Sequence, residues 1–288
     1  MQRNRLRLFR DLAVLLAALV ALTVMGGTAA YAMSRQVVAL QRSTVSVRSS
    51  ATSSRKAAAT STASAAPQPY RVVGLGDSVP AGTNCGCTSY VVRIGQQAAR
   101  QHGRPAAVTN LAQPGLTTAG LAAQLRRPAV RSAIADADLV IITIGANDFD
   151  PDLLTASDCQ PATALSCYQS VLATQRSLLS SVLAQVNALQ TRSGGRILVT
   201  GYWNVFRDGQ VGRDQGAAYV EGGNALTRAD NALIASVSAA HGDTYVDIYT
   251  PFKGDGSKDD TALLASDGDH PNAAGHALIA RTLLGALA

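Results

Sequence analysis

Short apolar runs alternate with longer amphipathic segments between residue 70 and the C-terminus. The apolar runs have the composition of buried strands and lie at residues 70–75, 106–109, 139–144, 196–201 and 244–249. The segments around them carry apolar residues at helical spacing, at about residues 89–102, 117–125, 168–191, 224–240 and 273–287. Strands separated by helices imply a parallel sheet with right-handed crossovers. The pattern predicts one α/β domain over residues 70–288, which is long enough to bury a single core.

The first 69 residues have a different pattern. A cationic stretch at residues 1–10 precedes a run without charge from Leu12 to Met33, and Ala30-Tyr31-Ala32 is similar to a signal-peptide cleavage site. Residues 1–33 are predicted to be a cleaved signal peptide or a retained signal-anchor transmembrane helix, and the length of the uncharged run favours the anchor. Residues 34–69 are rich in Ser, Thr and Ala and predict a flexible linker, with a helical stalk as the alternative.

Residues 1–33 are called the leader below. Whether the leader is cleaved or retained, the C-terminal domain is expected outside the cytoplasmic membrane, as a secreted or membrane-anchored protein. Membrane contact is then expected only through the N-terminal segment. The chain has 25 Lys and Arg against 19 Asp and Glu, but nine of the basic residues and only one acidic residue precede residue 70. The domain itself therefore has a net charge of −2, and no nucleic-acid partner is expected, because such a partner requires clustered basic residues on the folded surface.

The sequence Asp-Gly-Asp-His at residues 267–270 places a carboxylate three residues before an imidazole. Residues at this spacing are neighbours on a helical turn. Asp267 could therefore accept a hydrogen bond from Nδ1–H of His270, which leaves Nε2 free to take a proton from a nucleophile. The alternative is that His270 is only a capping residue before Pro271.

Three turns follow predicted strands and offer the remaining chemistry. Gly76-Asp77-Ser78 presents a serine hydroxyl after the first strand, Gly115 ends the turn after the second, and Gly145-Ala146-Asn147-Asp148 follows the third. Such turns meet at the carboxyl edge of an open α/β sheet, where ligands bind. The backbone N–H groups of Ser78 and Gly115 and the side-chain amide of Asn147 could surround an oxyanion. Taken singly, Ser78 could be a turn serine, Asn147 a helix cap and Gly115 a residue required for positive φ.

The four blocks together, in this order, resemble the SGNH (GDSL-type) hydrolases from about residue 70 to the C-terminus. The resemblance implies a flavodoxin-like three-layer α/β/α sandwich with a central parallel sheet of about five strands. It also implies Ser78 as nucleophile, His270 as base oriented by Asp267, and an oxyanion hole formed by Ser78, Gly115 and Asn147. Val79 stands where the family often has leucine, but this apolar neighbour performs no chemistry.

Four cysteines in a protein expected to be exported indicate disulfides. Cys159 with Cys167 is the easy local pair, Cys85 with Cys87 would close a small ring, and the other pairings require two loops to meet. A zinc site has spacing unlike the common ribbons, so no metal is expected. The loop after the fourth strand, residues 202–223, is predicted to be long and glycine-rich and carries the only tryptophan, Trp203. We expect Trp203 to form a wall of the substrate pocket; the alternative is a core position.

Competing motifs are incomplete. Gly74-Leu75-Gly76 begins like a dinucleotide fingerprint but has Val79 where the third glycine belongs, Ser78 lacks the second glycine of G-x-S-x-G, and residues 255–260 lack the final glutamate of an EF-hand loop. No cofactor is therefore expected. The sequence predicts an extracytoplasmic serine esterase or lipase-like acylhydrolase whose substrate is a small-molecule, lipid or acylated-glycan ester. The alternative is a non-catalytic flavodoxin-like binding module of the cell envelope.

Overall fold

The computed structural model describes residues 67–288. Its centre is a parallel sheet with the strand order β2-β1-β3-β4-β5. The strands are β1 (Tyr70–Gly76), β2 (Ala106–Asn110), β3 (Leu139–Thr143), β4 (Arg196–Thr200) and β5 (Thr244–Val246). This order is that of a flavodoxin-like doubly wound sheet, so the predicted fold class is confirmed.

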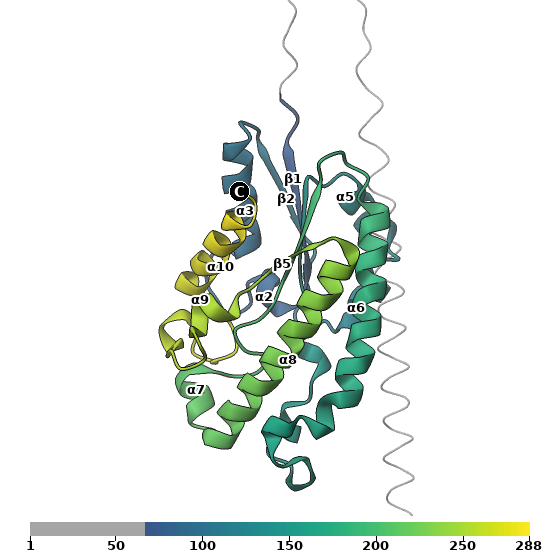
Figure 1. Ribbon diagram of the computed structural model, residues 1–288. Coiled ribbons are helices and arrows are strands. Elements are labelled where there is room, and N and C mark those ends of the chain that lie inside the picture. Colours follow the sequence, from purple (N-terminus) through teal and green to yellow (C-terminus); the bar gives the residue numbers. More distant parts are fainter. Residues whose placement is uncertain (1–66) are drawn as a thin grey trace, which may run out of the picture. The chain divides into compact units, whose positions relative to one another are not determined.

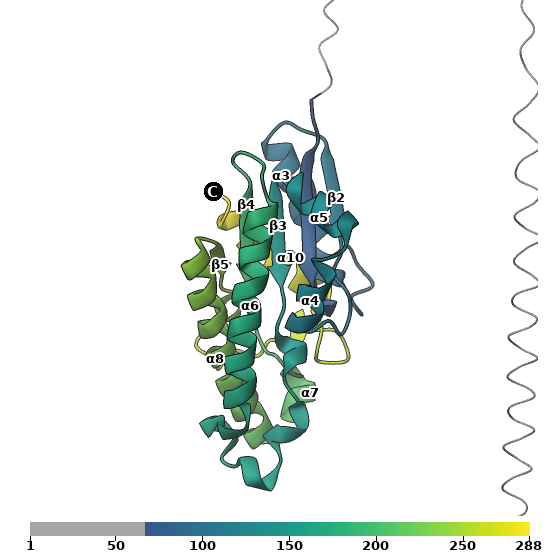
Figure 2. The same ribbon diagram turned by 90° about the vertical axis from the view of Figure 1, so that its right-hand side faces the viewer.

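Helices cover both faces of the sheet and form the outer layers of the sandwich (Figure 1). One face carries α3 (Tyr90–Gln101), α9 (Tyr249–Lys253) and α10 (Ala273–Gly285). The other carries α5 (Pro128–Ala135), α6 (Gln169–Leu189) and α8 (Ala217–His241), and Figure 2 shows α6 and α8 side by side in front of the sheet. The shorter helices are α2 (Ser78–Ala81), α4 (Thr118–Gln124) and α7 (Gly209–Arg213). Six 3₁₀ turns lie in the described loops: Ala146–Asp148, Pro151–Leu154, Ser157–Cys159, Ala162–Ala164, Ser166–Tyr168 and Thr261–Leu263.

The central strand β3 explains why the sheet is covered on both faces. Its sequence Leu-Val-Ile-Ile-Thr is buried at every position, as expected for a parallel strand with helices on both sides. On α3, the buried residues Tyr90, Val91, Ile94 and Ala98 recur at helical spacing and face the sheet, while Arg100 is exposed. Burial of this apolar surface fixes the helices against the sheet.

The carboxyl ends of β1 and β3 form the switch point of the sheet. The chain leaves β1 towards α3 on one face and leaves β3 towards α6 on the other. Because the connections diverge there, a crevice opens at the strand ends, and ligands of doubly wound folds bind in it. The sequence blocks that begin at Gly76 and Gly145 lie at these two ends.

The structure corrects the prediction of a long glycine-rich loop from residue 202 to residue 223. This segment contains α7, and α8 begins at Ala217 rather than near residue 224. Gly222 lies inside α8 because the helix packs closely there: a Cβ atom at this position would lie 2.7 Å from Cβ of Ala162. The helix α5 was not predicted, and the run at residues 244–249 is a strand only as far as Val246.

The predicted leader at residues 1–33 and nearly all of the predicted linker at residues 34–69 lie outside the described residues. From residue 67 onward, no helix is both long and apolar enough to cross a membrane.

Candidate active site

Ser78 is the first residue of α2 and directly follows the end of β1. The backbone before it is tightly constrained, because Gly76 has φ of +127° and a Cβ atom there would lie 1.8 Å from the carbonyl oxygen of Thr143. Asp77 caps α2 by accepting a hydrogen bond from the N–H of Val79 on Oδ1 at 2.9 Å. The strand end and this cap hold Ser78 at the carboxyl edge of the sheet.

Asp77 is a buried structural carboxylate that the sequence did not single out. Its Oδ2 accepts a hydrogen bond from the hydroxyl of Tyr202, at the end of β4, at 2.5 Å. Burial raises the pKa of Asp77 to about 6, although the hydrogen bonds from Tyr202 and Val79 and the nearby His270 act in the opposite direction. His270 therefore acts electrostatically on the residue that precedes Ser78.

Asp267 and His270 form the contact that their spacing predicts. Nδ1 of His270 lies 2.7 Å from Oδ2 of Asp267, and Oδ1 accepts hydrogen bonds from the backbone N–H groups of Asp269 at 2.9 Å and His270 at 3.1 Å. Partial burial acts to raise the pKa of Asp267, but its hydrogen bonds outweigh this effect and lower the pKa to about 2. The carboxylate is therefore ionised at neutral pH and fixes the orientation of the imidazole.

Asn84 is a further residue of this site that the sequence did not indicate. It lies in the loop after α2, and its side-chain Nδ2–H donates to Oδ2 of Asp267 at 2.5 Å across 183 residues of sequence. This bond joins the segment that follows Ser78 to the loop that carries His270. Ser78 itself makes no side-chain hydrogen bond to His270 within the described residues, a geometry that is common in unliganded sites.

Gly115 and Asn147 are brought together by bonds between the loops after β2 and β3. Nδ2 of Asn147 donates to the carbonyl oxygen of Leu116 at 3.1 Å, and Asp148 accepts hydrogen bonds from the N–H of Thr118, at 2.9 Å, and from its hydroxyl. Gly115 has φ of +76° and lies in open space, so its backbone is accessible. An amide has two hydrogens, so Asn147 keeps one donor for a ligand.

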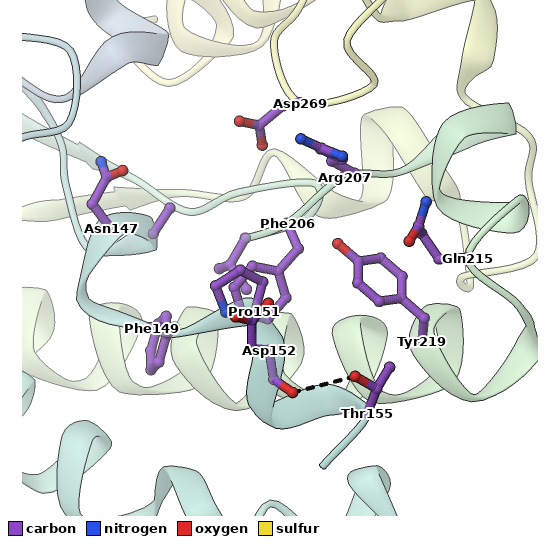
Figure 3. A pocket seen from close by; sticks show the side chains of 12 residues that line it. Asn147, Phe149, Pro151, Asp152, Thr155, Phe206, Arg207, Gln215, Tyr219 and Asp269 are labelled. Carbon is purple, nitrogen blue, oxygen red and sulfur yellow. Dashed lines mark hydrogen bonds between the residues drawn. The ribbon is translucent and has the colours of Figure 1, made fainter.

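A cavity of about 420 Å³ lies between Asn147 and Asp269, the residue next to His270 (Figure 3). Aromatic side chains contribute to its wall, namely Phe149, Phe206 and Tyr219. Polar side chains complete the lining, namely Asp152, Thr155, Arg207 and Gln215. Arg207 lies beside Asp269 in the close view and counteracts the rise in the pKa of Asp269 that burial causes. The cavity is therefore mixed in character rather than a continuous apolar channel.

Trp203 does not line this cavity, which corrects its predicted role as a pocket wall. Only 1% of its surface is exposed, and its ring stacks on Phe252 at 4.9 Å. The expected loop does contribute to the cavity, but through Val205, Phe206 and Arg207. The indole belongs to the core because it packs on Phe252 of α9, and the chain reaches the cavity two residues later, at Val205.

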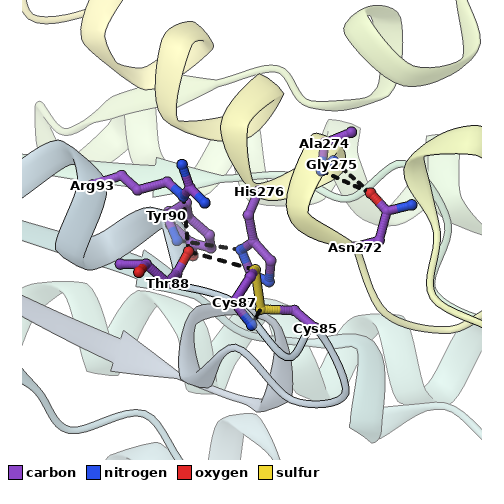
Figure 4. The surroundings of a disulfide bond; sticks show 9 residues. All are labelled: Cys85, Cys87, Thr88, Tyr90, Arg93, Asn272, Ala274, Gly275 and His276. Atoms are coloured by element: carbon purple, nitrogen blue, oxygen red, sulfur yellow. Dashed lines mark hydrogen bonds between the residues drawn. A yellow bond between two sulfur atoms is a disulfide. The ribbon is translucent and has the colours of Figure 1, made fainter.

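The cysteines form two local pairs, Cys85 with Cys87 and Cys159 with Cys167. The first pair follows Asn84 directly and lies against His276 of α10 (Figure 4). The second closes the loop between the 3₁₀ turns that precede α6. Cys85, Cys87 and His276 also have the chemistry of metal ligands, but the two sulfur atoms are bonded to each other, so this group is not a ligand set.

Comparisons with known proteins agree with this geometry. Residues 75–278 match the model of the GDSL-like lipase/acylhydrolase family. The lipase Lip_vut3 from a goat rumen metagenome is 18% identical with a TM-score of 0.58, over 75% of this chain and 96% of that one. A catalytic mutant of Axe2, an acetylxylan esterase from Geobacillus stearothermophilus, is 20% identical with a TM-score of 0.53, over 76% of this chain and 94% of that one.

No curated protein sequence matches the chain significantly. The structural likenesses establish the shared fold, and the family match extends over most of the described domain and spans the serine turn, both oxyanion candidates and the Asp267–His270 pair. The chain therefore belongs to the GDSL-like lipase/acylhydrolase family of ester-hydrolysing enzymes.

Proposed function

We propose that the chain is a serine esterase that cleaves carboxylic esters through an acyl-enzyme on Ser78. In this proposal His270 is the general base, Asp267 orients it, and the N–H groups of Ser78, Gly115 and Asn147 form the oxyanion hole. The observation that carries the proposal is the 2.7 Å contact between Nδ1 of His270 and Oδ2 of Asp267, in a loop bonded to the segment that follows the serine. This contact leaves Nε2 of His270 as the nitrogen that accepts a proton.

The reaction follows from these roles. Oγ of Ser78 attacks the ester carbonyl carbon while its proton passes to Nε2 of His270, and the ionised Asp267 stabilises the resulting imidazolium. The negative charge on the former carbonyl oxygen is stabilised by the three N–H donors. When the tetrahedral intermediate collapses, the proton on Nε2 passes to the departing alkoxide. Water then attacks the acyl-enzyme with His270 again as base, which releases the acid and regenerates Ser78.

The cavity beside Asn147 supports a preference for compact esters. It is about 420 Å³ in volume, and polar side chains interrupt its aromatic wall, so an extended acyl chain would contact charged groups. We expect acetyl and butyryl esters to be cleaved faster than long-chain esters, of either a lipid or an acylated glycan. Axe2, whose fold is similar, is an acetylxylan esterase. The leader at residues 1–33 supports an extracytoplasmic location, anchored or secreted.

A fluorophosphonate probe tests the proposal, because only an activated serine reacts with it. The full chain should become labelled at Ser78 and should hydrolyse butyryl esters, whereas Ser78→Ala should lose both properties while its unfolding transition is unchanged. Ser132→Ala, at an exposed position on α5, is the matched control and should behave as wild type. Ester binding without labelling or turnover would instead favour the non-catalytic binding module.

A further inference from the structure

The loop after α2, residues 82–88, is held in a conformation that few residues adopt. Asn84 has φ of 56°, in the left-handed region, where asparagine is more readily accommodated than other residues with a side chain. The N–H of Thr83 donates to the carbonyl oxygen of Ser78 at 3.1 Å, so the loop turns back immediately after the nucleophile. This turn directs the Asn84 amide at Asp267, which it reaches at 2.5 Å.

The residues after Asn84 are held by a disulfide that lies against α10. Cys85 is bonded to Cys87, and the N–H of Cys87 lies 3.0 Å from Sγ of Cys85. A ring nitrogen of His276, on α10, lies within 4.8 Å of both sulfur atoms (Figure 4). Nδ1 of His276 accepts a hydrogen bond from the N–H of Tyr90, the first residue of α3, at 3.2 Å. The disulfide therefore lies against His276 of α10, and this histidine is in turn bonded to the start of α3.

His276 is neutral and packs against the loop at residues 82–88 without donating a hydrogen bond to it. Because Nδ1 accepts a hydrogen bond, the neutral ring carries its hydrogen on Nε2, which has no partner within the described residues. Burial, with smaller effects of Arg93 and His270, lowers the pKa of His276 to about 4, so the ring is neutral at pH 7. A metal ion at Nε2 would have to displace this hydrogen, so the imidazole packs against the disulfide rather than serving as a ligand.

We propose that Asn84 is a positioning residue for the Asp267–His270 pair and that the Cys85–Cys87 disulfide holds its amide in place. This inference rests on the proposed function. Oδ2 of Asp267 accepts hydrogen bonds from both Asn84 and His270, and Oδ1 accepts two backbone N–H groups. With four donors on two oxygens, the carboxylate has one orientation, and Asn84 supplies the only one of these donors outside the 267–270 loop.

The charges around Asp267 allow the role of Asn84 to be separated from theirs. His270 and Asp269 lie on the same loop, Arg207 approaches Asp269 from the loop after β4, and Asp77 and His276 face His270 from the end of β1 and from α10. Among the contacts that lower the pKa of Asp267 against the effect of burial, the bond from Asn84 is the largest. Asn84→Gly removes that bond and leaves every charge in place.

Two substitutions at Asn84 distinguish the effect of its side-chain amide from the effect of the loop's backbone conformation. Glycine tolerates the left-handed conformation, so Asn84→Gly preserves the turn and removes only the donor. We expect kcat for a butyryl ester to fall roughly 10- to 100-fold with KM unchanged, as for loss of a hydrogen bond to a charged group. Asn84→Asp places a second carboxylate against Asp267, so its loss of kcat/KM should deepen as the pH rises and the pair ionises. If the loop has only a structural role, Asn84→Gly should retain the wild-type kcat and Asn84→Asp should lose kcat/KM to the same extent at every pH.

The disulfide is tested by the double variant Cys85→Ser/Cys87→Ser. We expect it to lose kcat in the same direction as Asn84→Gly, and the combination of the two changes should cost little more than either alone, because both act through one contact. Cys159→Ser/Cys167→Ser removes the other disulfide and should retain the wild-type kcat. Additive losses, or equal losses in the two double variants, would overturn the role of the disulfide. If the first double variant fails to fold while Cys159→Ser/Cys167→Ser folds, the disulfide serves the whole fold rather than the amide and its proposed role is overturned, whereas Asn84→Gly still decides the role of the amide.

The Nδ1–H proton of His270 provides a readout that does not depend on turnover. Its downfield NMR resonance reports the hydrogen bond to Asp267, and it should shift and broaden in Asn84→Gly relative to wild type. If wild type hydrolyses no ester but the resonance responds to Asn84→Gly, the proposed function fails and the positioning contact stands. If wild type is active and neither kcat nor the resonance changes in Asn84→Gly, the positioning role is refuted and the esterase assignment stands.

Discussion

Replacing the buried Asp230 by asparagine should stabilise the protein, and increasingly so as the pH rises. Asp230 lies on α8 with no exposed surface; its Oδ1 accepts a hydrogen bond from Nε2 of Gln175 at 2.7 Å, and Oδ2 has no partner within the described residues. Burial raises its pKa to about 8, against the lowering effect of the Gln175 bond, and the carboxylates of Asp148 and Asp77 raise it further. In the unfolded chain the pKa is about 3.9. Folding therefore takes up a proton at neutral pH.

The sign and size of the effect follow from this proton uptake. The contribution of Asp230 is most favourable below about pH 4, where both states are protonated, and is lost as the pH rises towards about 8. Each pH unit between the two pKa values corresponds to about 1.4 kcal/mol in the free energy of unfolding. About 5 kcal/mol of stability is therefore lost over the whole range, and about 3 kcal/mol between pH 5 and pH 7.5. Asp230→Asn does not titrate, keeps an acceptor for Gln175 and adds a donor near its unpaired Oε1. The free energy of unfolding of Asp230→Asn relative to wild type should therefore increase by about 3 kcal/mol between pH 5 and pH 7.5.

Urea unfolding followed by the fluorescence of Trp203 measures this difference, because that residue is the only tryptophan and is buried. Each free energy of unfolding is compared at pH 5 and pH 7.5, so that titrations common to both proteins cancel. Asp136→Asn, at an exposed carboxylate at the end of α5, is the matched control and should show no growing difference. A constant difference between Asp230→Asn and wild type at the two pH values would refute the reasoning.

Three further predictions concern the site and the leader. Asn147→Ala should lower kcat by roughly 10²- to 10³-fold with little change in KM, as for a donor used in the transition state; steady-state kinetics would show a rise in KM alone if Asn147 only held the bound ester. Trp203→Ala should destabilise the fold by about 3–5 kcal/mol without changing the acyl-chain profile, whereas Phe206→Ala in the cavity wall should change it; the reverse pattern in unfolding and rate measurements would restore Trp203 to the pocket. In the native host, fractionation should find the chain in the membrane, whereas an N-terminus at Met33 would establish cleavage of the leader instead.

The sheet and the sequence blocks at its edge could be predicted because their signals are local. The apolar runs mark the buried strands, and Asp267 and His270 are close in sequence, so their contact follows from spacing. Ser78, Gly115 and Asn147 could be placed at one edge because parallel strands end there together. Placing these segments required only periodicity and the geometry of a doubly wound sheet, whereas the roles of Ser78, Gly115 and Asn147 also required the resemblance to the SGNH hydrolases.

The rest depends on contacts between distant segments. Asn84 lies in an irregular loop with no periodic signal, and its partner is 183 residues away. Tyr202 and Asp77 meet only because β1 and β4 end at the same edge. The sequence could not show that Trp203 is a core residue and Phe206 a cavity-lining residue, because this depends on the direction in which each side chain points after β4. The glycines of α8 predicted a loop because the close packing of Gly222 against Ala162 can be recognised only from the fold.

The bond between Asn84 and Asp267 also has a consequence for when activity appears during synthesis. Ribosomes release the serine segment, the sheet and most helices well before they release residues 267–270. In the proposed mechanism, every earlier fragment therefore holds the nucleophile Ser78 without its base His270, and the site is completed only when the loop at residues 267–270 bonds to Asn84. The same closure brings α10 against α3, so completion of the fold and acquisition of reactivity coincide. A chain interrupted before residue 267 would therefore lack the base that the proposed mechanism requires.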